Sequence, residues 1–202
     1  MRRLTSALLC SAVLGAQAAP PARVEIAYAL LRDGSAIAEI TERMEHDGRH
    51  YLLVETWRGK GVYALRGEAR RSSRGAIAAD GLRPEEFEEQ RPGREARRLR
   101  LPAYSQDRLS VFWHLAFNPP AAPVSIEVAD DKGASTHRYA PAGRERVRTP
   151  AGEFEALRIV REGGERRVEA WLATARDHFP VRLRITEKDG TTLEQVAVRI
   201  VK

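Results

Sequence analysis

The chain has 202 residues and a formal net charge of +6, from 34 Lys or Arg and 28 Asp or Glu. Basic and acidic residues are interspersed along the chain, whereas a nucleic-acid-binding protein gathers its positive charge on one face. The composition therefore argues against a nucleic-acid partner and indicates a charged surface with a mild cationic bias.

Residues 1–19 have the pattern of a secretory signal peptide. Arg2 and Arg3 form a positive start, residues 4–14 form a short apolar run, and Ala16-Gln17-Ala18 provides the small residues that a signal peptidase recognises. The apolar run is about half as long as a membrane-spanning helix, which argues against an anchor. We therefore expect cleavage after Ala18 or Ala19 and a periplasmic protein.

Cleavage would leave residues 20–202 as the mature chain, with no transmembrane segment. The one cysteine, Cys10, would be lost with the signal peptide, which excludes disulfides, thiol catalysis and thiolate metal sites. Loss of Arg2 and Arg3 would lower the net charge from +6 to +4. The remaining length fits a single domain held together by one hydrophobic core.

Apolar side chains recur at every second residue over most of the mature chain, which is the period of a strand with one buried face. The series that start at Val24 and at Phe179 are the clearest, and Val196, Val198 and Ile200 form another. Asp-Gly pairs at 33–34, 47–48 and 189–190 indicate tight hairpins. We expect strands near residues 23–31, 36–45, 49–57, 64–73, 82–91, 95–101, 124–129, 135–140, 143–148, 153–162, 166–173, 178–187 and 192–201.

Many short strands at even spacing, joined mostly hairpin to hairpin, predict a mainly β fold. The simplest arrangement is a large antiparallel meander sheet that curls into a half-open barrel, with a sandwich as the alternative. Residues 20–202 would form this β-barrel-like domain.

One segment, residues 106–117, has a helical rather than an alternating pattern. The residues that follow the i, i+3, i+4, i+7 spacing are Leu109, Phe112, Trp113 and Ala116. Ser105 or Asp107 could cap the start of this helix. Further apolar residues widen the stripe almost all the way round, so we expect the helix to pack against the concave face of the sheet.

Residues 83–100 are rich in charge. If Pro92-Gly93 forms the turn of a hairpin, Glu88 faces Arg97 and Glu85 faces Arg100, which would stabilise a solvated sheet face. The alternative is a binding site for an acidic partner. It would be built from Arg94, Arg97, Arg98 and Arg100.

Signatures of catalysis and metal binding are absent from the sequence: there is no nucleophile elbow, zinc-protease helix or phosphate-binding loop. His46 and His50 have the spacing of a metal pair, but they flank the Asp47-Gly48 turn and no third ligand is indicated nearby. We therefore expect no enzyme activity, no cofactor and no metal.

The three tryptophans allow two interpretations. They could fill the core, as large aromatic side chains generally do. Alternatively, a curved sheet capped by one helix leaves an apolar cavity for a ligand. The candidate cavity residues are Leu109, Phe112, Trp113, Ala116, Trp57 and Trp171.

The C-terminal third contains several motifs in sequence. They are Thr149-Pro150-Ala151-Gly152-Glu153-Phe154-Glu155-Ala156, Arg158-Ile159-Val160, Glu169-Ala170-Trp171-Leu172, Phe179-Pro180-Val181-Arg182-Leu183 and Glu187-Lys188-Asp189-Gly190. This series resembles the exported bacterial family catalogued as domain of unknown function 3108, and the resemblance spans nearly all of the mature chain. It implies a periplasmic β protein without an established activity.

The same tail is also similar to periplasmic lipoprotein carriers of the LolA and LolB type, which are half-open barrels capped by helices. This second resemblance implies a cavity for an apolar ligand. The sequence thus favours an envelope protein that binds or carries a lipid or the acyl chain of a lipidated partner. The alternative is a structural or assembly module with a packed core that acts through its charged hairpin.

Overall fold

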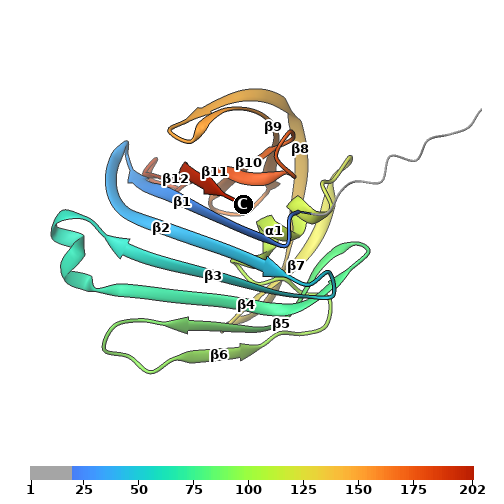
Figure 1. Cartoon of the computed structure of the whole chain (residues 1–202), viewed down its shortest axis with the longest axis horizontal. Coiled ribbons are helices and arrows are strands. Elements are labelled where there is room, and N and C mark those ends of the chain that lie inside the picture. Colours follow the sequence, from blue (N-terminus) through green and yellow to red (C-terminus); the bar gives the residue numbers. More distant parts are fainter. Residues whose placement is uncertain (1–19) are drawn as a thin grey trace, which may run out of the picture.

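The computed structural model describes residues 20–202, without the side chain of Arg66. The predicted signal peptide, residues 1–19, lies outside the described residues. The described residues contain one antiparallel sheet of 12 strands and a short helix (Figure 1). The strands are β1 (Arg23–Arg32), β2 (Ser35–His46), β3 (His50–Gly59), β4 (Glu68–Ala78), β5 (Gly81–Gln90), β6 (Arg97–Arg100), β7 (Val124–Asp130), β8 (Gly133–Thr149), β9 (Gly152–Glu162), β10 (Arg167–Ala173), β11 (Phe179–Thr186) and β12 (Thr192–Val201).

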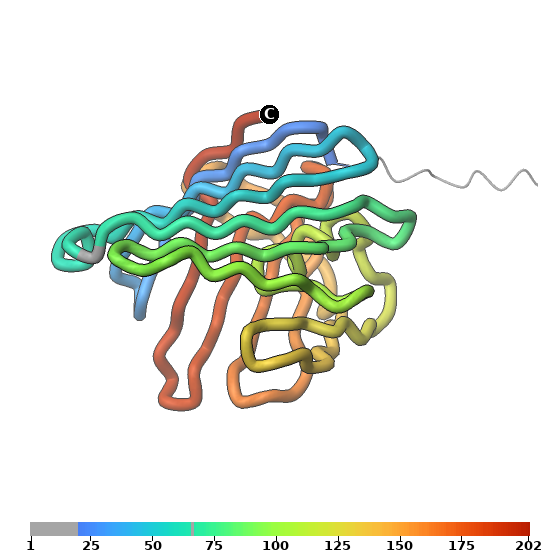
Figure 2. Tube along the Cα trace, turned by 90° about the horizontal axis from the view of Figure 1, so that it is seen from below, coloured from blue at the N-terminus to red at the C-terminus, as the bar shows by residue number. Residues whose placement is uncertain are grey.

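The sheet consists of two meanders joined through their β1 and β12 strands, in the middle of the sheet. β1 to β6 pair in chain order, β7 to β12 do the same, and β1 pairs with β12 between them. The sheet bends round until it nearly closes into a barrel (Figures 1 and 2). The predicted antiparallel meander curled into a half-open barrel is therefore confirmed.

Two strand boundaries differ from the prediction because glycine geometry changes the local path. The strands expected at 135–140 and 143–148 are one strand, β8, whose register with β9 shifts between Pro141 and Arg144. Gly143 has φ +97, which lets the chain bulge there and continue pairing instead of turning back. The strand expected from residue 64 begins at Glu68, because Gly61–Arg66 form a 3-10 helix, η1.

The helix, α1, spans Ser110–Phe117 and begins later than predicted. Asp107 caps it: its Oδ1 accepts hydrogen bonds from the backbone N–H groups of Leu109 and Ser110, both at 2.8 Å. The other predicted capping residue, Ser105, donates its hydroxyl to the Pro102 carbonyl instead.

α1 packs on the concave face of the sheet, as predicted, and it contacts both meanders. Val111 and Leu115 belong to a cluster with residues of β7 to β10, among them Ile126, Ile159 and Leu172. Leu109 and Trp113 belong to the main core. This core also includes Val24, Ile26, Met44 and Leu53 of β1 to β3.

The edge strands β6 and β7 do not pair with each other, and the segment before α1 bridges the seam between them. The N–H of Gln106 donates to the Glu127 carbonyl at 2.7 Å, and its carbonyl accepts from the N–H of Ala129 at 2.8 Å. Arg97 of β6 forms an ion pair with Asp131, which follows β7. The seam is therefore held by a short backbone bridge and one salt bridge.

Two predicted details are wrong because of strand register. In the β5–β6 hairpin the opposed pairs are Glu88 with Arg98 and Glu86 with Arg100, one residue out of step with the prediction. The loop spans residues 91–96, longer than a Pro-Gly turn, which moves the register.

In β12 the fully buried residue is Ala197, whereas Val198 is 37% exposed. The register with β1 shifts between Ala27 and Tyr28, and this bulge reverses the expected phase of alternation at Ala197, whereas Ile200 beyond it packs against the main core as predicted.

The Asp107 carboxylate joins the helix cap to the sheet. Its Oδ2 accepts a hydrogen bond from the Ser73 hydroxyl at 2.5 Å, and the Ser73 hydroxyl also lies 2.8 Å from the Tyr51 hydroxyl.

We expect Asp107→Ala to lower the free energy of unfolding by about 2–4 kcal/mol, through loss of the cap and of a buried acceptor. Urea denaturation measures this. The control is Asp130→Ala, which removes only an exposed turn contact to the Lys132 N–H; an equal effect of both changes would contradict the role of Asp107.

Candidate functional site

A cavity of about 220 Å³ lies beneath α1, between the two meanders. Three predicted cavity residues line it together: Leu109, Phe112 and Trp113. The facing wall comes from β11 and consists of Pro180, Leu183 and Ile185. The fourth predicted helix residue, Ala116, is 3% exposed and packs outside this lining.

Trp57 lines a neighbouring hollow of about 340 Å³ with Leu30, Tyr63 and Leu193. The two hollows adjoin, because Leu193 of the second is paired directly with Ile185 of the first. The two hollows, one under the helix and one near η1, are therefore neighbours. Each is lined by both apolar and charged side chains, which include Arg71 and Arg108 in the first and Arg32 and Asp189 in the second.

Trp171 lies away from both hollows. Its strand neighbours Ala170 and Leu172 pack in the helix cluster, so the indole points to the opposite face of β10. There the guanidinium groups of Arg158 and Arg182 lie over its ring at 5.7 and 5.0 Å, and its N–H donates to Glu145. Trp171 thus lines neither hollow, although it belongs to the same buried main core as Leu109 and Trp113.

A row of charged side chains crosses the inner face of the first meander. Glu42, Glu55, Arg71 and Glu89 are paired in register on β2, β3, β4 and β5. Arg71 donates to Glu55 and to Glu89, both at 2.8 Å, and Arg108 reaches Glu89 at 2.7 Å. The three carboxylates are each less than 8% exposed.

Sequence reasoning did not single out this row. A signal was present, because Glu42 lies between Ile40 and Met44 in the apolar phase of its strand, and Glu55 lies between Leu53 and Trp57. A charged residue in the phase that faces the core is a candidate for a buried polar group.

Glu42 differs from the other carboxylates of the row, because it forms no ion pair with any residue that the structure describes. The Trp113 indole N–H donates to its Oε2 at 2.9 Å, and the Gln195 side-chain amide donates to its Oε1 at 3.0 Å. Burial, followed by the negative charge of Glu55, raises the pKa of Glu42 to about 7. The Glu42 carboxyl, which accepts a hydrogen bond from Trp113 of the helix, therefore changes its charge near neutral pH.

Glu89 shows the opposite behaviour. Although desolvation raises its pKa, the hydrogen bond from Arg71 and the charge of Arg108 outweigh it and lower the pKa to about 2. Glu89 is therefore ionised at all physiological pH values and anchors both arginines.

The arginines of the predicted alternative site are only partly available. Arg97 is paired with Asp131, and Arg98 is paired with Glu88 at 2.8 Å. Arg94 and Arg100 form no ion pair with any residue in 20–202.

The two histidines with metal spacing do not converge. His46 Nε2 lies 2.7 Å from the Pro20 carbonyl oxygen, whereas His50 lies beside Asp47. Within the described part of the chain, no three His, Cys, Asp or Glu side chains could hold a metal ion together. No helix among residues 20–202 is long and apolar enough to cross a membrane.

The fold and the interior define a class of protein: a nearly closed antiparallel barrel that encloses one helix and a partly polar cavity. The chain belongs to the family described as "Protein of unknown function (DUF3108)", whose model matches residues 88–196. The first resemblance drawn from the sequence is thus confirmed. The second, to lipoprotein carriers, stays a prediction.

The solved structures to which this chain is similar come from distant proteins. A beta-barrel-like protein of DUF1849 from Brucella abortus has a TM-score of 0.55 at 9% identity, over 90% of this chain and 98% of that one. A candidate exported protein with a YmcC-like fold from Bacteroides fragilis has a TM-score of 0.46 at 13% identity, over 91% and 98%. A candidate lipoprotein from Parabacteroides distasonis has a TM-score of 0.41 at 12% identity, over 92% of this chain and 96% of that one. The comparison with curated proteins gave no match.

The raised pKa of Glu42 predicts a specific pH dependence of stability. The folded state holds the proton more tightly than the unfolded state, so the free energy of unfolding should fall as pH rises from about 5 to 8, by roughly 2 kcal/mol. In Glu42→Gln this contribution should be lost. Urea denaturation across this pH range measures it, and the difference between wild type and variant isolates Glu42 from the histidines.

The control is Glu39→Gln, at an exposed position of the same strand where Lys60 lowers the pKa of the carboxyl. This variant should keep the wild-type slope between pH 5 and 8. A wild-type slope in Glu42→Gln as well would show that Glu42 does not titrate in this range.

Proposed function

We propose that the protein is a non-enzymatic binding protein of the periplasm, which holds an apolar ligand inside its barrel. The observation that carries this proposal is the cavity beneath α1, where Leu109, Phe112 and Trp113 face an apolar wall of β11. Pockets lined mainly by apolar side chains, with a few placed polar groups, are typical of small-molecule sites. Six of the eleven lining residues are apolar here, and the polar groups are Gln195 and the charged side chains of Glu42, Glu55, Arg71 and Arg108.

The size of the interior favours a single acyl chain. The cavity of about 220 Å³ is smaller than an ordinary ligand pocket of roughly 300–1,000 Å³. The adjoining hollow at Trp57 adds about 340 Å³. A slender chain that extends from one space into the other fits this shape better than a ligand with several chains.

The N-terminal sequence supports the periplasmic location, because residues 1–19 have the composition and order of a cleavable signal peptide. The alternative function, an assembly module that acts through the charged hairpin, has weaker support. Two of its four arginines, Arg97 and Arg98, are engaged in ion pairs within the protein.

The test is lipid extraction and mass spectrometry of protein purified from the periplasm. We expect an acyl-chain lipid in the wild-type protein and at least a tenfold lower content in Leu183→Trp, which fills the cavity. The control is Val198→Trp, which adds the same side chain at a position 37% exposed. Thermal unfolding checks that both variants fold.

Wild-type protein that contains no lipid, and that also fails to bind a fluorescent fatty acid added in vitro, would overturn the proposal. Equal lipid loss in both tryptophan variants would show that the cavity is not the binding site.

A further inference from the structure

A third hollow, of about 1000 Å³, lies on the outer face of the sheet, and among its lining residues Tyr51 also belongs to the main core. Its outward position follows from register: Arg74, Glu86 and Arg100 are paired across β4, β5 and β6, one residue out of step with Phe87, which packs in the core. The segment that follows β6 forms its far wall. We call this hollow the outer groove.

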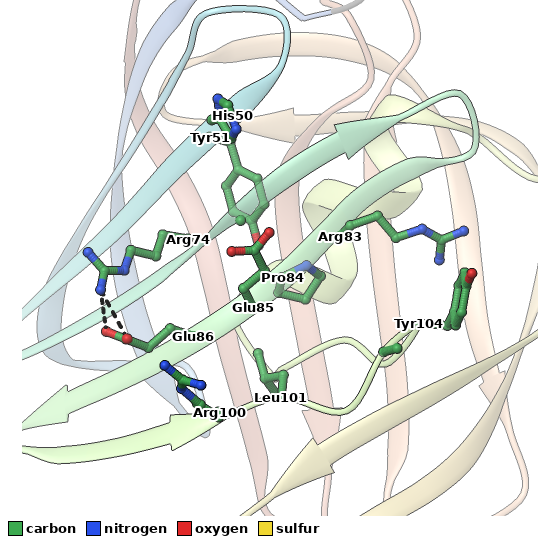
Figure 3. Close-up of a pocket in the computed structure, with 12 residues that line it drawn as sticks. His50, Tyr51, Arg74, Arg83, Pro84, Glu85, Glu86, Arg100, Leu101 and Tyr104 are labelled. Atoms are coloured by element: carbon green, nitrogen blue, oxygen red, sulfur yellow. Dashed lines mark hydrogen bonds and ion pairs between the residues drawn. The ribbon is translucent and has the colours of Figure 1, made fainter.

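Side chains of different character occupy the two ends of the outer groove (Figure 3). Arg74, Glu86 and Arg100 lie at one end, and Arg83 and Tyr104 lie at the other. Pro84, Leu101, Tyr51 and Glu85 lie between them, so the middle combines apolar side chains with one carboxylate. The groove is therefore elongated, with polar groups and an aromatic ring at separate positions.

Some of its polar groups are already used within the protein. Arg74 donates to Glu86 at 3.0 Å, and Arg83 is paired with Asp80. Arg100 and Glu85, by contrast, form no ion pair with any described residue, and both are exposed. The groove thus presents one guanidinium and one carboxylate that remain available, which makes it nearly neutral overall and able both to donate and to accept hydrogen bonds.

Tyr104 is held in an unusual position at the rim. Its side chain is 74% exposed, and its backbone has φ +67, a left-handed conformation that non-glycine residues rarely adopt. The Arg83 guanidinium lies 4.6 Å from the centre of its ring. Such strain is characteristic of functional positions, and the folded chain gains little from an exposed ring.

We propose that the outer groove binds a short, uncharged oligosaccharide. A sugar hydroxyl both donates and accepts, so it complements an unpaired guanidinium and an unpaired carboxylate together. The apolar C–H face of a sugar ring packs against an exposed aromatic ring, which Tyr104 offers at the far end. A groove that is neutral overall does not favour an anion, since its positive and negative groups offset each other.

The test is isothermal titration of the purified protein with cellotetraose and with chitotetraose, two neutral tetrasaccharides that differ in their N-acetyl groups. We expect saturable binding of at least one. Arg100→Ala and Glu85→Ala should each weaken it at least fivefold. Arg94→Ala is the matched control, because Arg94 also lacks an ion pair but lies outside the groove; its affinity should equal that of the wild type.

Tyr104→Gly separates binding from folding. Glycine accepts a positive φ without strain, and this gain offsets the greater freedom of glycine in the unfolded chain, so the variant should unfold close to the wild-type temperature. Its oligosaccharide affinity should nevertheless fall at least fivefold. Absence of binding for both sugars, or binding that none of the groove variants weakens, would overturn the proposal; so would an equal loss in Arg94→Ala.

Discussion

α1 stays inside the barrel because the segment that leads into it is fixed to both sides of the seam. Gln106 is bonded through its backbone to β7, and Asp107 is bonded through its side chain to Ser73 of β4 and to the first turn of α1. An eight-residue helix of this composition has little stability by itself, so its position depends on these contacts. The shape of the interior, and with it any ligand site, follows from them.

The interior that results is apolar on one wall and charged on the other. Arg71 and Arg108 compensate Glu55 and Glu89, which makes the burial of these groups tolerable. Glu42 lacks such a partner and relies on the neutral donors Trp113 and Gln195. The carboxyl that accepts a hydrogen bond from Trp113 of the helix is thus one whose pKa lies near neutral pH, at the wall of the cavity.

Much of the fold could be predicted because alternation and turn residues are local signals. Val24, Ile26 and Tyr28 reveal their face from sequence alone, and Asp107 lies where a capping residue is expected. Trp171 could not be placed in the same way. Nearly every residue of β10 is buried, on both of its faces, so its sequence carries no alternation to show which face an indole occupies.

Most strands, the hairpin order and the apolar character of the helix were predictable, since each depends on residues close together in the chain. Which side chains become neighbours across the sheet follows from the folded arrangement of the strands. The charged row from Glu42 to Glu89 and the alignment of Arg74, Glu86 and Arg100 in the outer groove both depend on strand register and bulges. A shift of one residue moves a side chain to the other face, and short-range periodicity does not encode that shift.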